Sequence, residues 1–231
     1  MPFFYLDYWY IVLVAPALLL AFWAQINVNT TFSRYSKVTA PSGMTGAESA
    51  RRVLEANGVV GVRIERISGN LTDHFDPKTN TIRLSESVYD ATTVSAVGVA
   101  AHEAGHAVQY AVGYSPMKLR AAIIPATNIG SQLAMPLVLL GLLLSSAMLV
   151  DIGIVAFSMS TLFQLVTLPV EFNASRRAGA TLDASCVSAA EVKGAKAVLR
   201  AAALTYVAAL AVSLASLLRI ILLFGGRNRR D

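Results

Sequence analysis

Two histidines and a glutamate near the middle of the chain have the types and spacing of a metal-dependent hydrolytic site. They lie in Ala100-Ala-His-Glu-Ala-Gly-His-Ala107, which contains the pattern His-Glu-x-x-His. Residues four apart share one face of a helix, so His102 and His106 can bind one ion, and neutral imidazole is a good Zn²⁺ ligand. Glu103 lies at the rim of that face, where it can accept a proton from an attacking water molecule. The pattern predicts zinc-assisted hydrolysis.

The surroundings of the pattern favour the helix that this chemistry requires. The stretch from Val94 to Tyr110 contains no proline, and small residues stand on both sides of the histidines. Thr92 or Thr93 can cap the helix at its start, and we expect it to end near Gly113. So short a pattern also arises by chance, but these helical, small-residue flanks argue against chance here.

The composition is that of a membrane protein. Of the 231 residues, 55% are apolar and only 14% are charged, which is unlike ordinary soluble domains. The formal net charge of +5 fits basic loops on the cytoplasmic side of a membrane. No stretch interleaves basic residues with exposed aromatics, so no nucleic-acid partner is expected. The single cysteine, Cys186, excludes an intrachain disulfide and a cysteine-based zinc site.

Three apolar stretches are expected to make four crossings of a bilayer. Residues 3–26 predict a retained anchor with aromatic residues at both ends, a cleaved signal peptide being the alternative. Residues 133–170 are twice the length of one crossing and predict a helical hairpin that turns at Asp151-Ile-Gly153. A last span is expected at residues 198–224, followed by a basic tail at 225–231. The chain is therefore expected to be a multi-pass membrane protein in contact with the lipid bilayer.

The polar segment at residues 27–132 is expected to form the catalytic domain. Thr45-Gly-Ala-Glu48 is a capping box that predicts a short amphipathic helix, which Asn57-Gly58 should end. Alternating residues predict strands at Val60–Ile67 and Thr81–Leu84, on either side of a turn-rich stretch at Asp73–Asn80.

A small sheet beside the helix of the metal motif would complete that domain. An exposed edge of such a sheet can hold an extended peptide by strand addition. The predicted fold class is mainly α: a multi-span helical membrane protein with a small α+β zinc-protease-like domain, made of the active-site helix and a short sheet.

A catalytic zinc site needs a third protein ligand, with the fourth position left for water. His74 is one candidate and Glu171, in the polar segment at residues 171–197, is another. Two crossings separate Glu171 from the metal motif, so the chain returns to the same face, whereas Asp151 follows only one crossing. A single glutamate at the end of a span can equally be an interface residue, so the local sequence leaves this choice open.

Several longer stretches of the chain resemble those of a known protein family, and together they are far more specific than the metal motif alone. They are Leu71-Thr-Asp-His-Phe-Asp-Pro77, Ile82-Arg-Leu-Ser85 with Val88-Tyr89, Gly98-Val-Ala-Ala-His-Glu-Ala-Gly-His-Ala107, Leu168-Pro-Val-Glu-Phe-Asn-Ala-Ser-Arg-Arg-Ala178 and Ala202-Ala-Leu-Thr-Tyr-Val-Ala208. With these stretches the chain resembles, over nearly its whole length, the putative neutral zinc metallopeptidases of bacterial membranes. The resemblance implies a multi-pass protein of the plasma or inner membrane of a bacterial cell.

The resemblance implies a ligand set. The family is similar to zinc proteases whose third ligand is a glutamate on a later helix, which supports Glu171. In many of those enzymes an aspartate four residues after that glutamate orients a zinc histidine, but this chain has Ser175 there. In this chain the residue that orients a zinc histidine would then be Ser175 or Asn173, or else Asp73 or Asp76 from the sheet region.

The implied activity is hydrolysis of peptide bonds in a protein or peptide substrate, with one Zn²⁺ per chain as cofactor. Zinc lowers the pKa of water to roughly 7 and polarises the carbonyl group, and Glu103 acts as general base. A further donor usually stabilises the oxyanion, by about 3–4 kcal/mol. His74, Tyr206 and Arg176 are candidates, although each has a structural role as its simpler explanation.

Two alternatives to a protease acting at the membrane face remain open. An intramembrane-cleaving zinc protease would use Asp151, but the polar residues of the motif helix disfavour a crossing there. A membrane scaffold that binds zinc for stability alone would normally close its site with a fourth protein ligand. The basic residues near the span ends predict a cytoplasmic active site.

Overall fold

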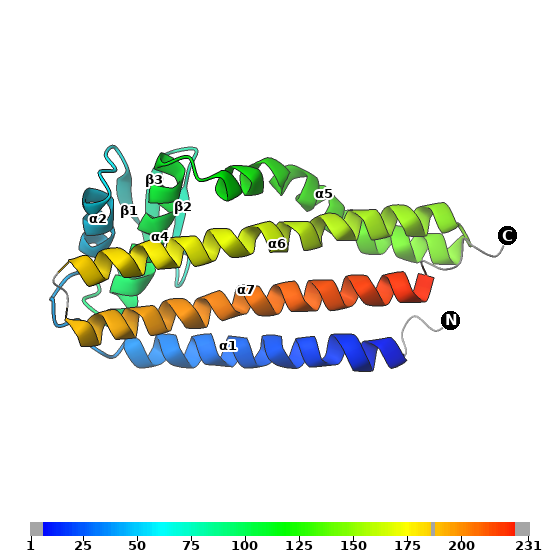
Figure 1. Cartoon of the computed structure of the whole chain (residues 1–231), viewed down its shortest axis with the longest axis horizontal. Coiled ribbons are helices and arrows are strands. Elements are labelled where there is room, and N and C mark those ends of the chain that lie inside the picture. Colours follow the sequence, from blue (N-terminus) through cyan, green and yellow to red (C-terminus); the bar gives the residue numbers. More distant parts are fainter. Residues whose placement is uncertain (1–6, 186–187, 225–231) are drawn as a thin grey trace. The chain divides into compact units, whose positions relative to one another are not determined.

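The computed structural model describes residues 7–185 and 188–224. These residues form a mainly helical protein with one small sheet, as the sequence predicts (Figure 1). They divide into two compact units. The sheet unit comprises residues 25–118 and 169–204, and the helical unit comprises the described parts of 1–24, 119–168 and 205–231. The first residues of the predicted anchor, Cys186 and the predicted basic tail lie outside the described residues.

The sheet has three strands in the order β1-β3-β2. β1 (Arg63–Ile67) pairs with β3 (Thr81–Ser85) in parallel, and β2 (His74–Asp76) pairs with β3 in antiparallel fashion. β1 and β3 confirm the two predicted strands. The prediction of a turn throughout Asp73–Asn80 was wrong for its first half, because Phe75 is buried in the core and Asp76 binds Arg83 across the strand pair.

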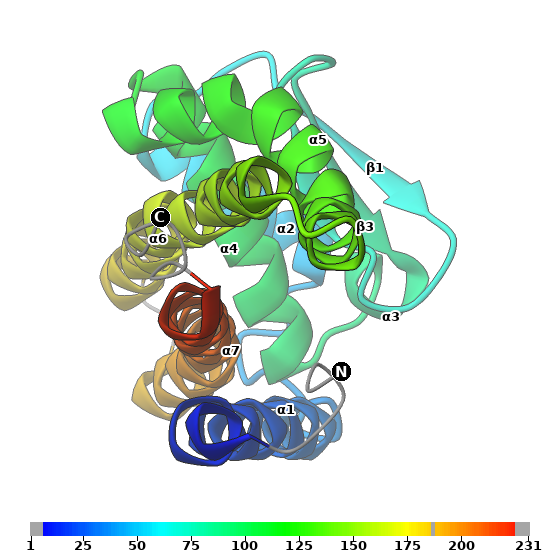
Figure 2. The ribbon, with the colours of Figure 1, turned by 90° about the vertical axis from the view of Figure 1, so that its right-hand side faces the viewer.

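The helix of the metal motif is the centre of the sheet unit. It is α4 (Val94–Ala111), capped by Thr93, and its small residues are almost entirely buried. α2 (Gly46–Ala56) lies directly against it (Figure 2). The predicted capping box at the start of α2 is present, with Thr45 and Glu48 bonded reciprocally. A short helix, α3 (Glu86–Tyr89), links the sheet to α4.

Four helices in the described part are long and apolar enough to cross a membrane. They are α1 (Ala15–Tyr35), which continues a π-helical turn at Tyr10–Val14, α5 (Ser115–Leu143), α6 (Ala147–Ala184) and α7 (Ala189–Phe224). Their number matches the predicted spans. The helices are longer than predicted, however, and α1 includes the stretch from Asn27 to Tyr35, which was assigned to the polar segment at residues 27–132.

The turn of the predicted hairpin lies seven residues before the expected position. It falls at Leu144–Ser146, where Ser145 has a positive φ of 52°. Gly153, expected in the turn, lies inside α6, where an added Cβ would come within 2.9 Å of the backbone nitrogen of Val138 on α5. This glycine therefore allows two helices to approach closely, and Asp151 is an exposed helical residue.

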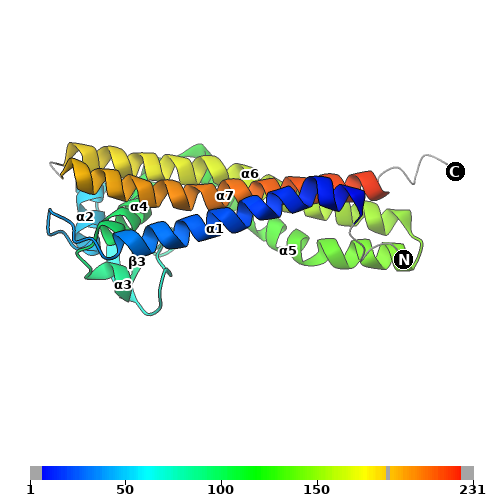
Figure 3. The same cartoon turned by 90° about the horizontal axis from the view of Figure 1, so that it is seen from below.

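The second half of the predicted hairpin and the start of the polar segment at 171–197 belong to one continuous helix. α6 runs for 38 residues through Pro169 and carries Glu171. α7 follows after a short loop, and within the sheet unit the two helices lie side by side (Figure 3).

Candidate metal centre

α4 and α6 bring three candidate metal ligands together inside the sheet unit. One ligand atom each from His102, His106 and Glu171 lies within 4.8 Å of the other two. The Glu171 Oε2 atom is 3.2 Å from Nε2 of His102 and 3.5 Å from Nε2 of His106. The two imidazole rings meet edge to face, with centroids 4.7 Å apart. The sequence-predicted histidines and the favoured third ligand are thus neighbours.

A glycine makes this close approach of the helices possible. Gly105 lies between the two histidines, and a Cβ added there would lie 2.6 Å from the backbone carbonyl oxygen of Ala174 on α6. Any side chain at this position would push the helices apart. The glycine of the motif region therefore sets the distance between the histidine pair and Glu171.

The three candidate ligands are largely buried, to different degrees. The side chain of Glu171 is 3% exposed and that of His106 is 10% exposed, whereas that of His102 is 15% exposed. Glu103 is half-buried on α4. His102 is thus the most exposed of the three candidate ligands.

Each histidine is held through its other ring nitrogen. Nδ1 of His102 is 3.1 Å from the Ser175 hydroxyl, and Nδ1 of His106 is 3.0 Å from Oε1 of Gln109. Ser175 thus takes the position that the resemblance left open. Of the other candidates, Asp73 binds Ser85 and Asp76 binds Arg83, and Asn173 binds the amide of Gln109.

Gln109 fixes the protonation of His106. Its Nε2 donates to the backbone carbonyl of Val170 at 2.8 Å and to Oδ1 of Asn173 at 3.0 Å. The carbonyl can only accept, so Oε1 of the amide must face His106. Nδ1 of a neutral His106 therefore carries the hydrogen, and Nε2 presents its lone pair towards Glu171.

Sequence reasoning missed Gln109. It is fully buried, and it lies three residues after His106 on the same face of α4. A polar side chain at that spacing beside a candidate ligand is a usable signal. Its role depends on contacts with α6, however, which the local sequence does not show.

The acidic surroundings change the proton affinity of His106. Burial alone lowers the pKa of a histidine, but the hydrogen bond to Glu171 and the charges of Glu103 and Glu171 outweigh it. The pKa of His106 is therefore raised above its ordinary value. A metal ion that binds Nε2 of His106 must displace the proton from that nitrogen.

The remaining predicted residues are His74, Arg176 and Tyr206, and none of them is one of the three grouped ligands. His74 is exposed on β2, and its Nδ1 is 2.8 Å from the carbonyl oxygen of Thr72. That carbonyl only accepts, so a neutral His74 has no hydrogen on Nε2 and could donate there only as an imidazolium. Arg176 is exposed on α6, and Tyr206 lies on α7 in the helical unit.

The donor set fits zinc. Two imidazole nitrogens and one carboxylate are the ligands of a catalytic zinc site with one open position. Both imidazoles have their far nitrogens engaged, as metal-binding histidines normally do. Within the described residues, these three residues form the one group of histidine, cysteine and acidic side chains with metal-binding spacing.

Comparisons with known proteins agree with this chemistry. The chain is 49% identical over 223 residues to "Putative membrane protease YugP" of Bacillus subtilis (strain 168), covering 96% of this chain and 98% of that protein. No solved structure matches the chain. The model of one family, described as "Putative neutral zinc metallopeptidase", matches residues 10–225. With nearly its whole length matched, the chain belongs to this zinc metallopeptidase family.

Proposed function

We propose that the protein is a membrane-embedded zinc metalloendopeptidase that cuts its substrates at the membrane face. The observation that carries the proposal is the ligand group of His102, His106 and Glu171, with both far ring nitrogens engaged by Ser175 and Gln109. Family membership and the membrane protease relative support the same activity class.

Different residues of the chain have different roles in hydrolysis. Zinc, when bound, supplies a Lewis acid that acidifies water and polarises the peptide carbonyl. Glu103 accepts the proton of the attacking water and passes it to the leaving amine. His102, His106 and Glu171 hold the ion, and Ser175 and Gln109 fix the ring orientations. Arg176, Tyr206 and a protonated His74 are the candidates for a hydrogen bond to the oxyanion.

The edge of the sheet offers a place for the substrate backbone. β2 is an edge strand, since it pairs with β3 on one side only, and α4 packs against it. An extended peptide added to β2 would run alongside the helix that carries the motif. His102, the most exposed of the three ligands, lies on that helix.

The length of α6 supports a site outside the hydrocarbon core. About 20 residues cross a bilayer, whereas α6 has 38 residues, and Glu171 lies 13 residues (184 − 171) before its end. Asp151 precedes Glu171 by 20 residues (171 − 151), which is about 30 Å along a helix. Because of this separation, only one of the two carboxylates can bind the metal ion, and the ligand group contains Glu171.

The intramembrane alternative is tested with matched variants of these two residues. Glu171→Ala should strongly weaken zinc binding, whereas Asp151→Ala should leave it nearly intact, as measured by metal analysis of the purified proteins. The reverse pattern would move the site into the membrane.

Hydrolysis itself is tested with the full chain in detergent or lipid nanodiscs. The purified protein should contain one zinc per chain and cleave casein. A chelator should abolish cleavage, and added zinc should restore it. Stoichiometric zinc without cleavage of any peptide would favour the scaffold alternative.

A further inference from the structure

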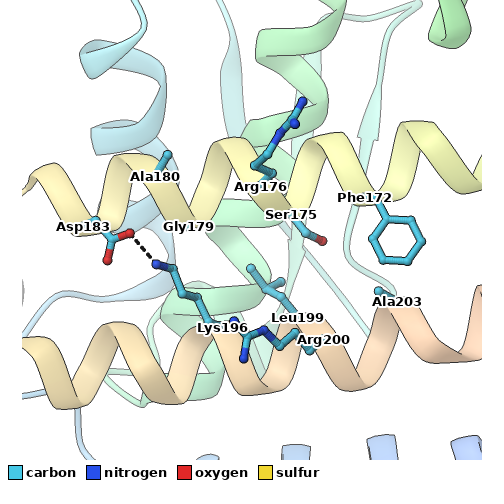
Figure 4. Close-up of a pocket in the computed structure, with 10 residues that line it drawn as sticks. All are labelled: Phe172, Ser175, Arg176, Gly179, Ala180, Asp183, Lys196, Leu199, Arg200 and Ala203. Carbon is cyan, nitrogen blue, oxygen red and sulfur yellow. Dashed lines mark hydrogen bonds and ion pairs between the residues drawn. The ribbon is translucent and has the colours of Figure 1, made fainter.

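A groove between α6 and α7 borders the metal centre within the sheet unit. Its volume is about 420 Å³, and its walls are formed by α6 from Phe172 to Asp183 and by α7 from Lys196 to Ala203 (Figure 4). Asp183 lies 11 residues after Phe172 (183 − 172) on the α6 wall, which is about 16 Å along the helix. An extended peptide rises about 3.3–3.6 Å per residue, so the groove can hold a segment of about five residues.

Ser175 connects this groove to the metal ligands. Its side chain lines the groove, and its hydroxyl is 3.1 Å from Nδ1 of His102. One imidazole ring therefore separates the groove wall from Nε2, the atom in the ligand group. A peptide lying in the groove would have its nearest residues within a few positions of a bond at the metal centre.

The groove has an excess of positive charge. Arg176, Lys196 and Arg200 line it together with a single acid, Asp183. Lys196 reaches across to α6 and binds Asp183, and Gly179 leaves room for the lysine side chain, since an added Cβ would lie 3.0 Å from its Cε (Figure 4). The charges of Lys196 and Asp183 therefore cancel each other.

Arg200 is the charge left for a ligand. It is exposed and makes no hydrogen bond or ion pair with any residue that the structure describes. Arg176 is also exposed, but its side chain points away from α7 (Figure 4). Beside Arg200, the side chains of Leu199, Ala203 and Phe172 form an apolar wall. The groove thus combines a free guanidinium with an apolar surface.

We infer that this groove is a substrate subsite that selects peptides with an acidic side chain within about five residues of the cleaved bond. The inference rests on the proposed peptidase function. A guanidinium binds a carboxylate through two parallel hydrogen bonds. The phosphate of an anionic lipid carries the same charge, but the groove's continuity with His102 through Ser175 favours the substrate.

The subsite is tested with two sets of peptides, one varied at a position before the cleaved bond and one at a position after it. In each set the varied position carries Glu, Gln or Lys. The wild type should cleave the Glu peptide with a kcat/KM about two- to fivefold above that of the Gln peptide, the range of one exposed ion pair. Arg200→Gln should remove this preference, and Arg200→Glu should favour the Lys peptide. Arg51→Gln, an exposed arginine on α2 outside the groove, should keep the wild-type preference. Added salt should weaken all of these differences.

Binding separates this inference from the proposed function. Fluorescent versions of the same peptides are titrated into zinc-loaded Glu103→Gln protein, with and without Arg200→Gln. A preference for Glu that depends on Arg200, without any cleavage by the wild type, would keep the subsite and remove the peptidase. Cleavage with no dependence on Arg200 would overturn the subsite.

A lipid occupant would give a third result. Protein in nanodiscs with and without phosphatidylglycerol is compared by counting the lipids that remain bound after extraction. If Arg200→Gln loses bound phosphatidylglycerol and leaves the peptide preference unchanged, the groove is a lipid site and the inference is wrong.

Discussion

The residues of the centre depend on hydrogen bonds made on the side of each imidazole that faces away from Glu171. Gln109 is the clearest case, because its amide is oriented by a backbone carbonyl that can only accept. Its effect on zinc therefore acts through the His106 ring, without a contact to the ion.

Gln109→Met removes this hydrogen bond at nearly constant volume. We expect zinc affinity to fall about 10- to 100-fold, the usual cost of losing such a partner. Zinc affinity is measured by competition with a chromophoric chelator. In the metal-free protein, at a pH above the raised pKa of His106, the ¹⁵N shifts of its neutral ring should also show loss of the fixed Nδ1–H tautomer, which a mere packing defect would not cause. Unchanged affinity and tautomer would show that Gln109 has no positioning role.

The raised pKa of His106 gives a pH dependence of zinc binding. In the metal-free protein, the proton on His106 is bound more tightly than on a free histidine, whose pKa is 6.5. The stability from its pairing with Glu171 is present below that value and is lost as the pH rises through the raised pKa. Zinc competes with this proton, so apparent zinc affinity should increase with pH above 6.5 and then level off. Isothermal titration in buffers of different ionisation enthalpy should detect the released proton, and no release at pH 7 would contradict this reasoning.

The residues predicted from the sequence were those whose geometry is local. His102, Glu103 and His106 share a helix, so their spacing alone predicted their arrangement. Glu171 is 65 residues beyond His106 (171 − 106), and the local sequence left it undecided until a topology argument and a resemblance favoured it. Gln109 was missed because only contacts with α6 give it a role.

Among the elements, α4 and α6 carry the centre, and glycine determines how closely they approach. Gly105 contacts the backbone of α6, whereas Gly98, two turns earlier on α4, faces Ala195 on α7 with more space. An added Cβ would lie 3.3 Å from Ala195 at Gly98, but 2.6 Å from Ala174 at Gly105.

Gly105→Ala should therefore be far more damaging than Gly98→Ala. Overpacking costs about 1–3 kcal/mol, and the separation of the helices should also weaken zinc binding by moving Glu171 away from the histidines. At Gly98 the gain in helix propensity, about 1 kcal/mol, should offset most of the cost. Thermal unfolding and chelator competition measure both effects. Equal zinc affinities in the two variants would refute the role given to Gly105.

The errors in the predicted elements have a common physical origin. Gly153 suggested a turn, yet it serves close packing of α5 and α6, and the sequence does not distinguish these uses of glycine. β2 was not predicted, because it lies in a turn-rich stretch and its three residues form a strand only by pairing with β3. Both depend on a neighbouring element, whereas the capping box and the helix of the motif, which are local, were predicted correctly.

For the whole molecule, the distribution of basic residues suggests which side of the membrane holds the centre. The segments that carry the metal ligands contain most of the lysines and arginines near the span ends, including Arg34, Lys37, Lys118, Arg176, Arg177 and Lys196. The other side would have Arg219 near the end of α7 and the tail arginines, beside the Leu144–Ser146 turn. The positive-inside rule then predicts a cytoplasmic active site with both termini outside.

A single cysteine tests this orientation. Lys78 is exposed in the turn after β2, and Lys78→Cys in a Cys186→Ser background provides one thiol. In intact cells it should resist a membrane-impermeant maleimide, and it should react after the cells are opened. Ready labelling in intact cells would place the centre on the outer face.

The measurement that tests the central claim most directly compares Glu103→Gln with the wild type. Glu103 stands beside the ligand group without belonging to it, so the variant should fold and bind one zinc per chain as the wild type does. Casein hydrolysis should fall by at least about 10²-fold, the contribution of a positioned general base. Both proteins are purified and assayed in parallel for zinc content and proteolysis. Full zinc with hydrolysis nearly abolished is the predicted result, and undiminished hydrolysis by Glu103→Gln would contradict the assignment of this chain as a zinc peptidase of this mechanism.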